Sequence, residues 1–103
     1  MTRRVTINDS AVADLDAIYW HGVETWGRQQ ARIYLEALES LFNLLAEQPE
    51  IALERKELDP PARLYLFRSH LVIFTANATE LDILRVVHAR SNWQAAFTEF
   101  MSD

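Results

Sequence analysis

The residues with the most chemical potential lie at the end of an apolar run near the C-terminus, in the segment LRVVHARSNW (84–93). His88 ends the run, with Arg85 before it and Arg90 after it. An imidazole transfers protons near neutral pH, and guanidinium groups stabilise a pentavalent phosphate. Together with Arg63, these residues form the catalytic set expected if the chain cleaves RNA. A histidine at a strand end is more often simply hydrogen-bonded, so this set is a hypothesis.

Arg85 is the strongest candidate for a functional side chain, because it lies within the apolar run itself. An arginine that is buried without a partner is costly, so it is kept where it is either paired or used. Two interpretations stand side by side. Arg85 belongs to a binding site, or it forms a structural ion pair with a carboxylate such as Glu57 or Asp59.

His70 and His88 are predicted on neighbouring strands, where they could lie as close together as two metal ligands. Two histidines without a third ligand make a poor zinc site. The chain has no cysteine, which excludes thiolate ligands, thiolate nucleophiles and disulfides. We therefore expect no metal and no cofactor.

The charge balance argues against a protein that grips nucleic acid. The chain has 10 Lys and Arg against 15 Asp and Glu, for a net charge of −5. DNA-binding domains usually carry a basic stripe, so we expect no direct DNA binding. No apolar run approaches the roughly 20 residues that span a bilayer, and no secretory signal core follows the N-terminal arginines. The sequence predicts a cytoplasmic protein without a membrane association.

A short strand and a helix are predicted at the N-terminal end. Residues 4–7 alternate polar and apolar side chains, which is typical of a strand. Asn8 can cap a helix that begins near Asp9, and Gly27 is a plausible end for it. The apolar stripe of this helix ends at Trp26, which we expect in the core.

A second helix, from Arg28 until Pro49, has an apolar stripe wide enough to face a core. The two helices should form an antiparallel hairpin. Residues 50–62, which include Pro60 and Pro61, are interpreted as a connecting loop.

Three short runs rich in β-branched and aromatic residues predict an antiparallel meander: RLYLFR (63–68), HLVIFTA (70–76) and LDILRVVH (81–88). The last run is apolar on both faces, which places it at the centre of the sheet. We expect Leu84 and Val86 to share one face. Ile83 and Val87 should share the other.

The predicted fold class is α+β. A single domain over residues 1–103 would contain an N-terminal strand, the antiparallel two-helix hairpin packed on a small antiparallel sheet of about four strands, and a short C-terminal helix within the tail 91–103. Trp93 lies in this tail, and Trp20 lies off the main stripe of the first helix. Both are therefore better candidates for interface contacts than Trp26.

The order and spacing of several motifs resemble the ParE/RelE superfamily of bacterial toxins, and its ParE branch more closely, over about residues 4–90. The matching segments are ADLDAIYWHGVETWG (13–27), QARIYLEALESLFNLLAEQPEIA (30–52) and SHLVIFTANATELDILRVVHAR (69–90). The resemblance implies the toxin of a type II toxin–antitoxin pair, which inhibits DNA gyrase and is neutralised by a cognate antitoxin. It implies no accepted catalytic constellation.

Two alternatives stay open beside the gyrase inhibitor. The RelE branch would imply a ribosome-dependent mRNA endoribonuclease, which the set around His88 could serve. The segment RSHLVIFT (68–75) departs from the ParE pattern, with Arg68 in place of a usual glycine and Phe74 in place of a usual tyrosine. This departure suggests an inactive module that only binds an antitoxin.

We expect a concave surface beside the end of the last strand to be the working site, covered by an extended or helical antitoxin segment that adds apolar contacts and carboxylates. The predicted partner-binding residues are Trp20, His70, Phe74, Arg85, His88, Arg90 and Trp93.

Overall fold

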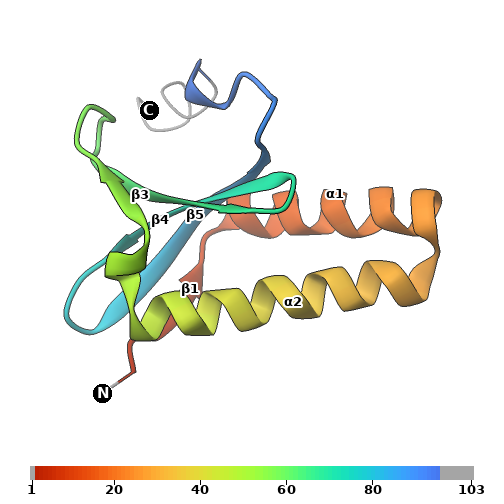
Figure 1. The fold of residues 1–103 in the computed structure, drawn as a ribbon, viewed down its shortest axis with the longest axis horizontal. Coiled ribbons are helices and arrows are strands. Elements are labelled where there is room, and N and C mark those ends of the chain that lie inside the picture. Colours follow the sequence, from red (N-terminus) through yellow and green to blue (C-terminus); the bar gives the residue numbers. More distant parts are fainter. Residues whose placement is uncertain (1, 96–103) are drawn as a thin grey trace.

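The computed structural model describes residues 2–95, in which two helices lie on one face of a five-stranded sheet (Figure 1). In chain order the elements are β1 (Arg4–Ile7), α1 (Asp9–Trp26), α2 (Arg28–Glu47), a 3₁₀ turn (Pro49–Ile51), β2 (Leu53–Arg55), β3 (Ala62–Phe67), β4 (His70–Ala76) and β5 (Glu80–His88). The α+β class and the helical hairpin are confirmed. Within the described residues, neither helix is long and apolar enough to cross a membrane.

The boundaries of α1 follow from the residues at its two ends. The side-chain oxygen of Asn8 accepts a hydrogen bond of 3.0 Å from the backbone N–H of Ala11, which satisfies one of the unpaired donors of the first turn. Gly27 has a φ of 94°, a left-handed conformation that few side chains tolerate, and it ends α1 one residue before α2 begins. The predicted cap and the predicted end are both confirmed.

The core lies between the helical hairpin and the sheet. The long apolar side chains of α2, among them Leu38, Phe42 and Leu45, pack against Phe74 of β4 and Ile83 of β5. Burial of each such side chain stabilises the fold by about 1.5–3 kcal/mol relative to its exposure. These contacts hold α2 across the sheet and thereby position α1 beside β5.

The sheet differs from the predicted one in strand number and in one strand direction. Its order is β1-β5-β4-β3-β2, and β1 runs parallel to β5 with Val5 opposite Leu81. The last strand, β5, has a neighbour on each side, but the central strand is β4 and not β5 as expected. The sheet has a fifth strand because part of the predicted loop 50–62 forms β2, which pairs with β3 through Leu53 and Leu64.

A β-bulge in β5 changes which side chains share a face. Ile73 lies opposite Arg85, whereas the next residue of β4, Phe74, lies opposite Ile83, so Leu84 is the extra residue. Ile83 and Val86 therefore both join the core under the helices, and Leu84 lies on the opposite face. Val87 packs with Leu84 on that opposite face, so both predicted shared faces, Leu84 with Val86 and Ile83 with Val87, were wrong. Strict alternation does not hold across a bulge.

The face of the sheet away from the helices has a smaller apolar cluster. Leu58, Ala62, Ile73 and Leu84 are buried there, and the half-buried Trp93 packs against them. Residues 93–95 have helical backbone, and the rest of the predicted C-terminal helix lies outside the described residues.

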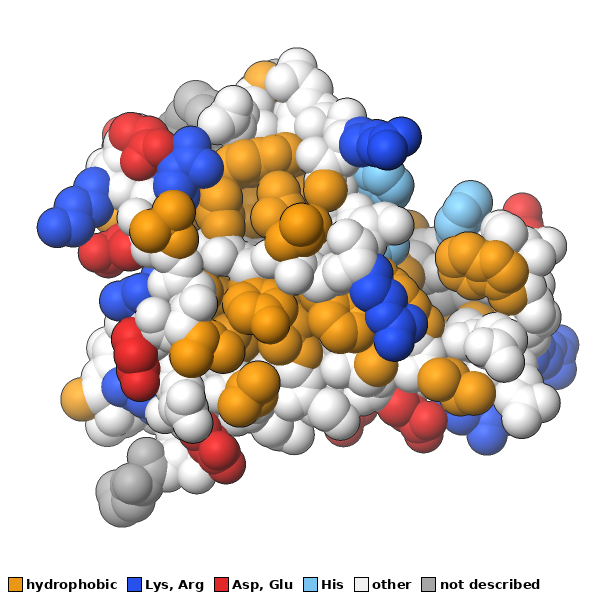
Figure 2. Space-filling view, in the orientation of Figure 1, with side chains coloured by type: hydrophobic (Ala, Val, Ile, Leu, Met, Phe, Trp, Pro, Cys, Tyr) orange, Lys and Arg blue, Asp and Glu red, His pale blue; other side chains and the backbone are white. Residues whose placement is uncertain are grey.

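Hydrophobic side chains form a broad band across the face shown in Figure 2, with most charged side chains around its perimeter. Two leucines of neighbouring strands are among the most exposed apolar residues: Leu53 of β2 is 72% exposed and Leu66 of β3 is 59% exposed. Charged and apolar surface are thus segregated on this face.

Candidate partner-binding cleft

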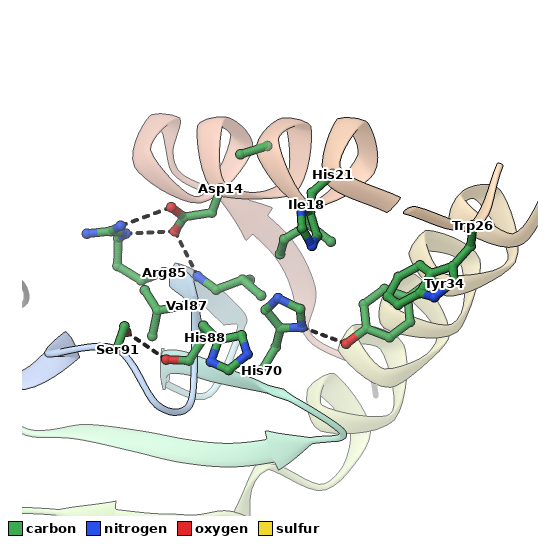
Figure 3. Close-up of a pocket in the computed structure, with 12 residues that line it drawn as sticks. Asp14, Ile18, His21, Trp26, Tyr34, His70, Arg85, Val87, His88 and Ser91 are labelled. Atoms are coloured by element: carbon green, nitrogen blue, oxygen red, sulfur yellow. Dashed lines mark hydrogen bonds and ion pairs between the residues drawn. The ribbon is translucent and has the colours of Figure 1, made fainter. Parts of the chain in front are cut away.

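Arg85 forms an ion pair with α1. Its Nε and Nη2 donate hydrogen bonds of 2.7 and 2.9 Å to the two carboxylate oxygens of Asp14, and the backbone N–H of Val86 donates a third, of 2.9 Å, to the same carboxylate (Figure 3). The two-point contact raises the pKa of Arg85 above its ordinary value. The ion-pair interpretation is therefore confirmed. The predicted partners Glu57 and Asp59 were wrong, since Glu57 pairs with Arg55 instead.

Topology explains why the partner is Asp14. The parallel pairing of β1 with β5 ends where Ile7 lies opposite Ile83, and the chain leaves β1 there to enter α1. Beyond that point the backbone N–H of Val86 faces α1 at the edge of β5 and reaches the Asp14 carboxylate. Sequence reasoning missed Asp14. The available signal was its position next to the apolar stripe of α1, one residue before Leu15.

His70 and His88 are direct cross-strand neighbours, as predicted. They lie opposite each other in the β4–β5 pairing, with ring centroids 5.7 Å apart. His70 Nδ1 forms a hydrogen bond of 2.6 Å with the Tyr34 hydroxyl of α2. Burial lowers the pKa of His70 below its ordinary value, and the neighbouring His88 and His21 lower it further, against a smaller opposing effect of Asp14.

Tyr34 links the helical hairpin to the sheet. Its ring contacts Phe67 and His70, and its burial raises the pKa of the phenol, an effect that the nearby Arg68 partly opposes. Arg68 lies in the tight turn between β3 and β4 with a φ of 55°, a left-handed conformation. That backbone explains why a glycine suits the same position in proteins that this segment resembles.

The guanidinium of Arg68 lies over two aromatic rings, 5.5 Å from the centroid of Tyr34 and 5.1 Å from that of Phe67. Cation–π contacts of this kind hold a charged side chain in place while its donors stay available. Arg68 is therefore an ordered cation at the end of the sheet.

Two adjoining hollows, of about 340 and about 670 Å³, form a cleft between the end of the hairpin and the end of the sheet. The residues that line both hollows are His21, Trp26, Tyr34, His70 and His88. Figure 3 shows these side chains converging from α1, α2, β4 and β5. We call the cleft formed by the two hollows the hairpin cleft.

Trp26 was predicted in the core but is 61% exposed, and its ring meets that of His21 edge to face on the wall of the hairpin cleft. The core stripe of α1 ends one turn earlier, at Gly22, where the helix closely approaches Ala31. A close crossing of the two helices leaves no room for an indole between them. Trp26 is therefore a site residue that sequence reasoning assigned to the wrong environment.

The other predicted partner-binding residues are scattered. Trp20 is 52% exposed on α1, and Arg90 is exposed after β5. Trp93 packs on the far face of the sheet. Phe74 is fully buried in the core, so its prediction as a contact residue was wrong: it belongs to the helix-covered face of the central strand.

The four residues of the hypothetical catalytic set do not converge. Arg63 lies opposite Phe74, and its guanidinium donates to the backbone carbonyl of Ala52. His88 lies opposite His70. His70 and Phe74 are four residues apart in β4, so Arg63 and His88 are separated by about 13 Å along the strand direction, at roughly 3.3 Å per residue. The Nδ1 of His88 accepts a hydrogen bond from the backbone N–H of Arg90.

Metal ligands do not converge in this cleft. Among residues 2–95, no group of three His, Asp or Glu side chains is placed to hold a metal ion. The sequence-based expectation of no metal and no cofactor stays a prediction.

The fold and the cleft define a class: a small α+β protein with a helical hairpin on one face of its sheet and an aromatic, cationic hollow at the hairpin's end. A family model described as "ParE toxin of type II toxin-antitoxin system, parDE" matches residues 5–93. The chain belongs to this family of ParE toxins, which confirms the resemblance seen in the sequence motifs.

Individual relatives agree with the family model. "Toxin ParE1" of Caulobacter vibrioides is 31% identical over 82% of this chain and 88% of its own, and "Toxin ParE1" of Mycobacterium tuberculosis is 30% identical over 87% and 93%. A solved structure described as "Chromosomal ParDE TA system from P. aeruginosa" matches with a TM-score of 0.71 and 26% identity. The match covers 84% of this chain and 96% of that chain.

Proposed function

We propose that this toxin acts by binding and inhibiting DNA gyrase, without chemistry of its own, and that a cognate antitoxin neutralises it by covering its surface. The observation that carries the proposal is the family match over residues 5–93. An antitoxin partner is also in line with the similar solved structure, which is described as a ParDE system.

The geometry of the candidate catalysts supports a binding toxin over a ribonuclease. General acid–base catalysis requires the proton-transferring group and the charge-stabilising group to reach the same phosphate. Arg63 and His88 lie about 13 Å apart along the strand direction, by roughly 3.3 Å per residue, and on strands separated by β4. Arg85 is neutralised by Asp14. Of the predicted catalytic set, this leaves the exposed Arg90 as the arginine next to His88. One such arginine gives little support for RNA cleavage.

Supercoiling of relaxed plasmid by purified DNA gyrase tests the proposal. We expect supercoiled product to decrease with increasing toxin and to recover when the antitoxin is added in equal amount. Heat-denatured toxin serves as the control, because it preserves composition and charge without the folded surface.

Undiminished supercoiling at large molar excess of toxin contradicts the proposal. New 5′ ends on messenger RNA after induction would then favour the endoribonuclease. Normal growth after induction without an antitoxin would favour the inactive module.

A further inference from the structure

The hairpin cleft has the composition of a site for one large apolar group beside one carboxylate. Trp26 and Ile33, which is 45% exposed, form apolar walls in the larger hollow. Exposed aromatic and aliphatic groups that line a hollow are typical of anchoring pockets for a partner's side chain.

The charge available to a ligand in the hairpin cleft is positive. Among the described residues that line its two hollows, Asp14 is the one carboxylate, and the guanidinium of Arg85 and the backbone N–H of Val86 occupy its oxygens. Arg68 and the histidines supply hydrogen-bond donors on the opposite wall. The cleft is therefore a cationic spot on a protein whose net charge is −5.

The donors at this wall are ordered before any partner arrives. The ring contacts with Tyr34 and Phe67 hold Arg68 in place, and the Tyr34 hydroxyl holds His70. Preordered donors lose less conformational freedom on binding than mobile surface side chains do.

We infer that the hairpin cleft binds a peptide segment of the antitoxin in which a large apolar side chain stands next to Asp or Glu. The apolar side chain lies between Trp26 and Tyr34, and the carboxylate accepts hydrogen bonds from Arg68. Nucleic acid is a poorer occupant, because it would place several phosphates next to an acidic protein whose described cleft residues include two arginines, one of which, Arg85, is already paired with Asp14. The inference rests on the proposed function only in its choice of a protein partner.

A pair of tetrapeptides tests this chemistry on the full chain. The probes are acetyl-Glu-Phe-Leu-Glu-amide and its neutral match, acetyl-Gln-Phe-Leu-Gln-amide, titrated to millimolar concentrations into ¹⁵N-labelled protein. We expect the acidic peptide to shift the signals of the Trp26 indole, His70 and His88. The neutral peptide should bind at least about threefold more weakly, because it lacks the charge-assisted hydrogen bonds to Arg68.

Two arginine variants separate the cleft from general attraction. Arg68→Gln should reduce binding of the acidic peptide to the level of the neutral one. Arg32→Gln removes the same charge from an exposed position on α2 outside the cleft and should leave binding unchanged. Trp26→Ala should weaken both peptides, because it removes the apolar wall. The dispersed amide spectrum of each variant confirms that it folds.

Equal binding of the two peptides, unchanged binding to Arg68→Gln, or no shift at Trp26, His70 and His88 overturns the inference. The outcomes are separable from those of the gyrase assay. If the peptides do not bind but the toxin inhibits supercoiling, the inference about the hairpin cleft is rejected and the proposed function is kept. If the acidic peptide binds selectively but supercoiling is undiminished, the inference is kept and gyrase inhibition is rejected.

Discussion

Asp14 holds three donors at once and joins α1 to the edge of β5. Asp14→Ala leaves Arg85 and the backbone N–H of Val86 without these bonds in a half-buried setting. The loss of acceptors for such groups costs about 1–3 kcal/mol, so we expect the free energy of unfolding to fall by about that amount in urea titration. Asp16→Ala, on the exposed side of the same helix, should change it by less than about 0.5 kcal/mol. Equal effects would contradict a special role for Asp14.

His70 couples stability to pH because burial lowers its pKa in the folded state. The unfolded chain binds a proton at His70 at a higher pH than the folded chain does. This contribution to stability is therefore fully present above about pH 6.5 and is lost as the pH falls through the lowered folded-state pKa. The urea midpoint of the wild type should fall more steeply between about pH 7.5 and pH 5.5 than that of His70→Gln. Parallel pH profiles would show that His70 does not contribute.

Among the elements, the helical hairpin depends on a close approach of its two helices. A Cβ atom built at Gly22 would lie 3.2 Å from the Cβ of Ala31, so a larger side chain there forces α1 and α2 apart. Helix propensity alone favours leucine over glycine by about 0.8 kcal/mol. We nevertheless expect Gly22→Leu to destabilise the protein by about 1–3 kcal/mol, because overpacking outweighs propensity.

Thermal or urea unfolding checks this sign, with the exposed Ala13→Leu on the same helix as the matched control. The control should stay within about 0.5 kcal/mol of the wild type. A stabilised Gly22→Leu variant would mean that the helices separate at little cost. Since Trp26 and Tyr34 flank this crossing, such a result would also make the hairpin cleft a deformable hollow rather than a rigid one.

Over the molecule as a whole, the distribution of charge matters more than its sum. The acidic excess of the chain disfavours nucleic acid over most of the surface, whereas Arg68 and the histidines concentrate donors at one end of the sheet. Leu53 and Leu66, two of the most exposed apolar side chains, lie on the face of the sheet away from the helices. Segregated surfaces of this kind suit a protein that is covered by a partner.

Local sequence was enough to predict the elements that depend on neighbours in the chain. The cap at Asn8, the break at Gly27 and the strand over 70–76 follow from local backbone preferences and short-range periodicity. The family was also predicted correctly, because the order and spacing of its motifs can be recognised in the sequence alone. An ion pair of Arg85 was one of two interpretations that the sequence left open, and its partner Asp14 was not predicted.

Contacts between residues far apart in the chain settled the remaining features. The parallel β1–β5 pair brings α1 to the edge of β5, which is why Asp14 meets Arg85 across 71 positions. The bulge at Leu84 reassigns the faces of β5, and the close helix crossing moves Trp26 from the expected core to the cleft wall. Periodicity describes one element at a time. Register, bulges and helix crossings are set by the packing of several elements, and no single segment encodes them.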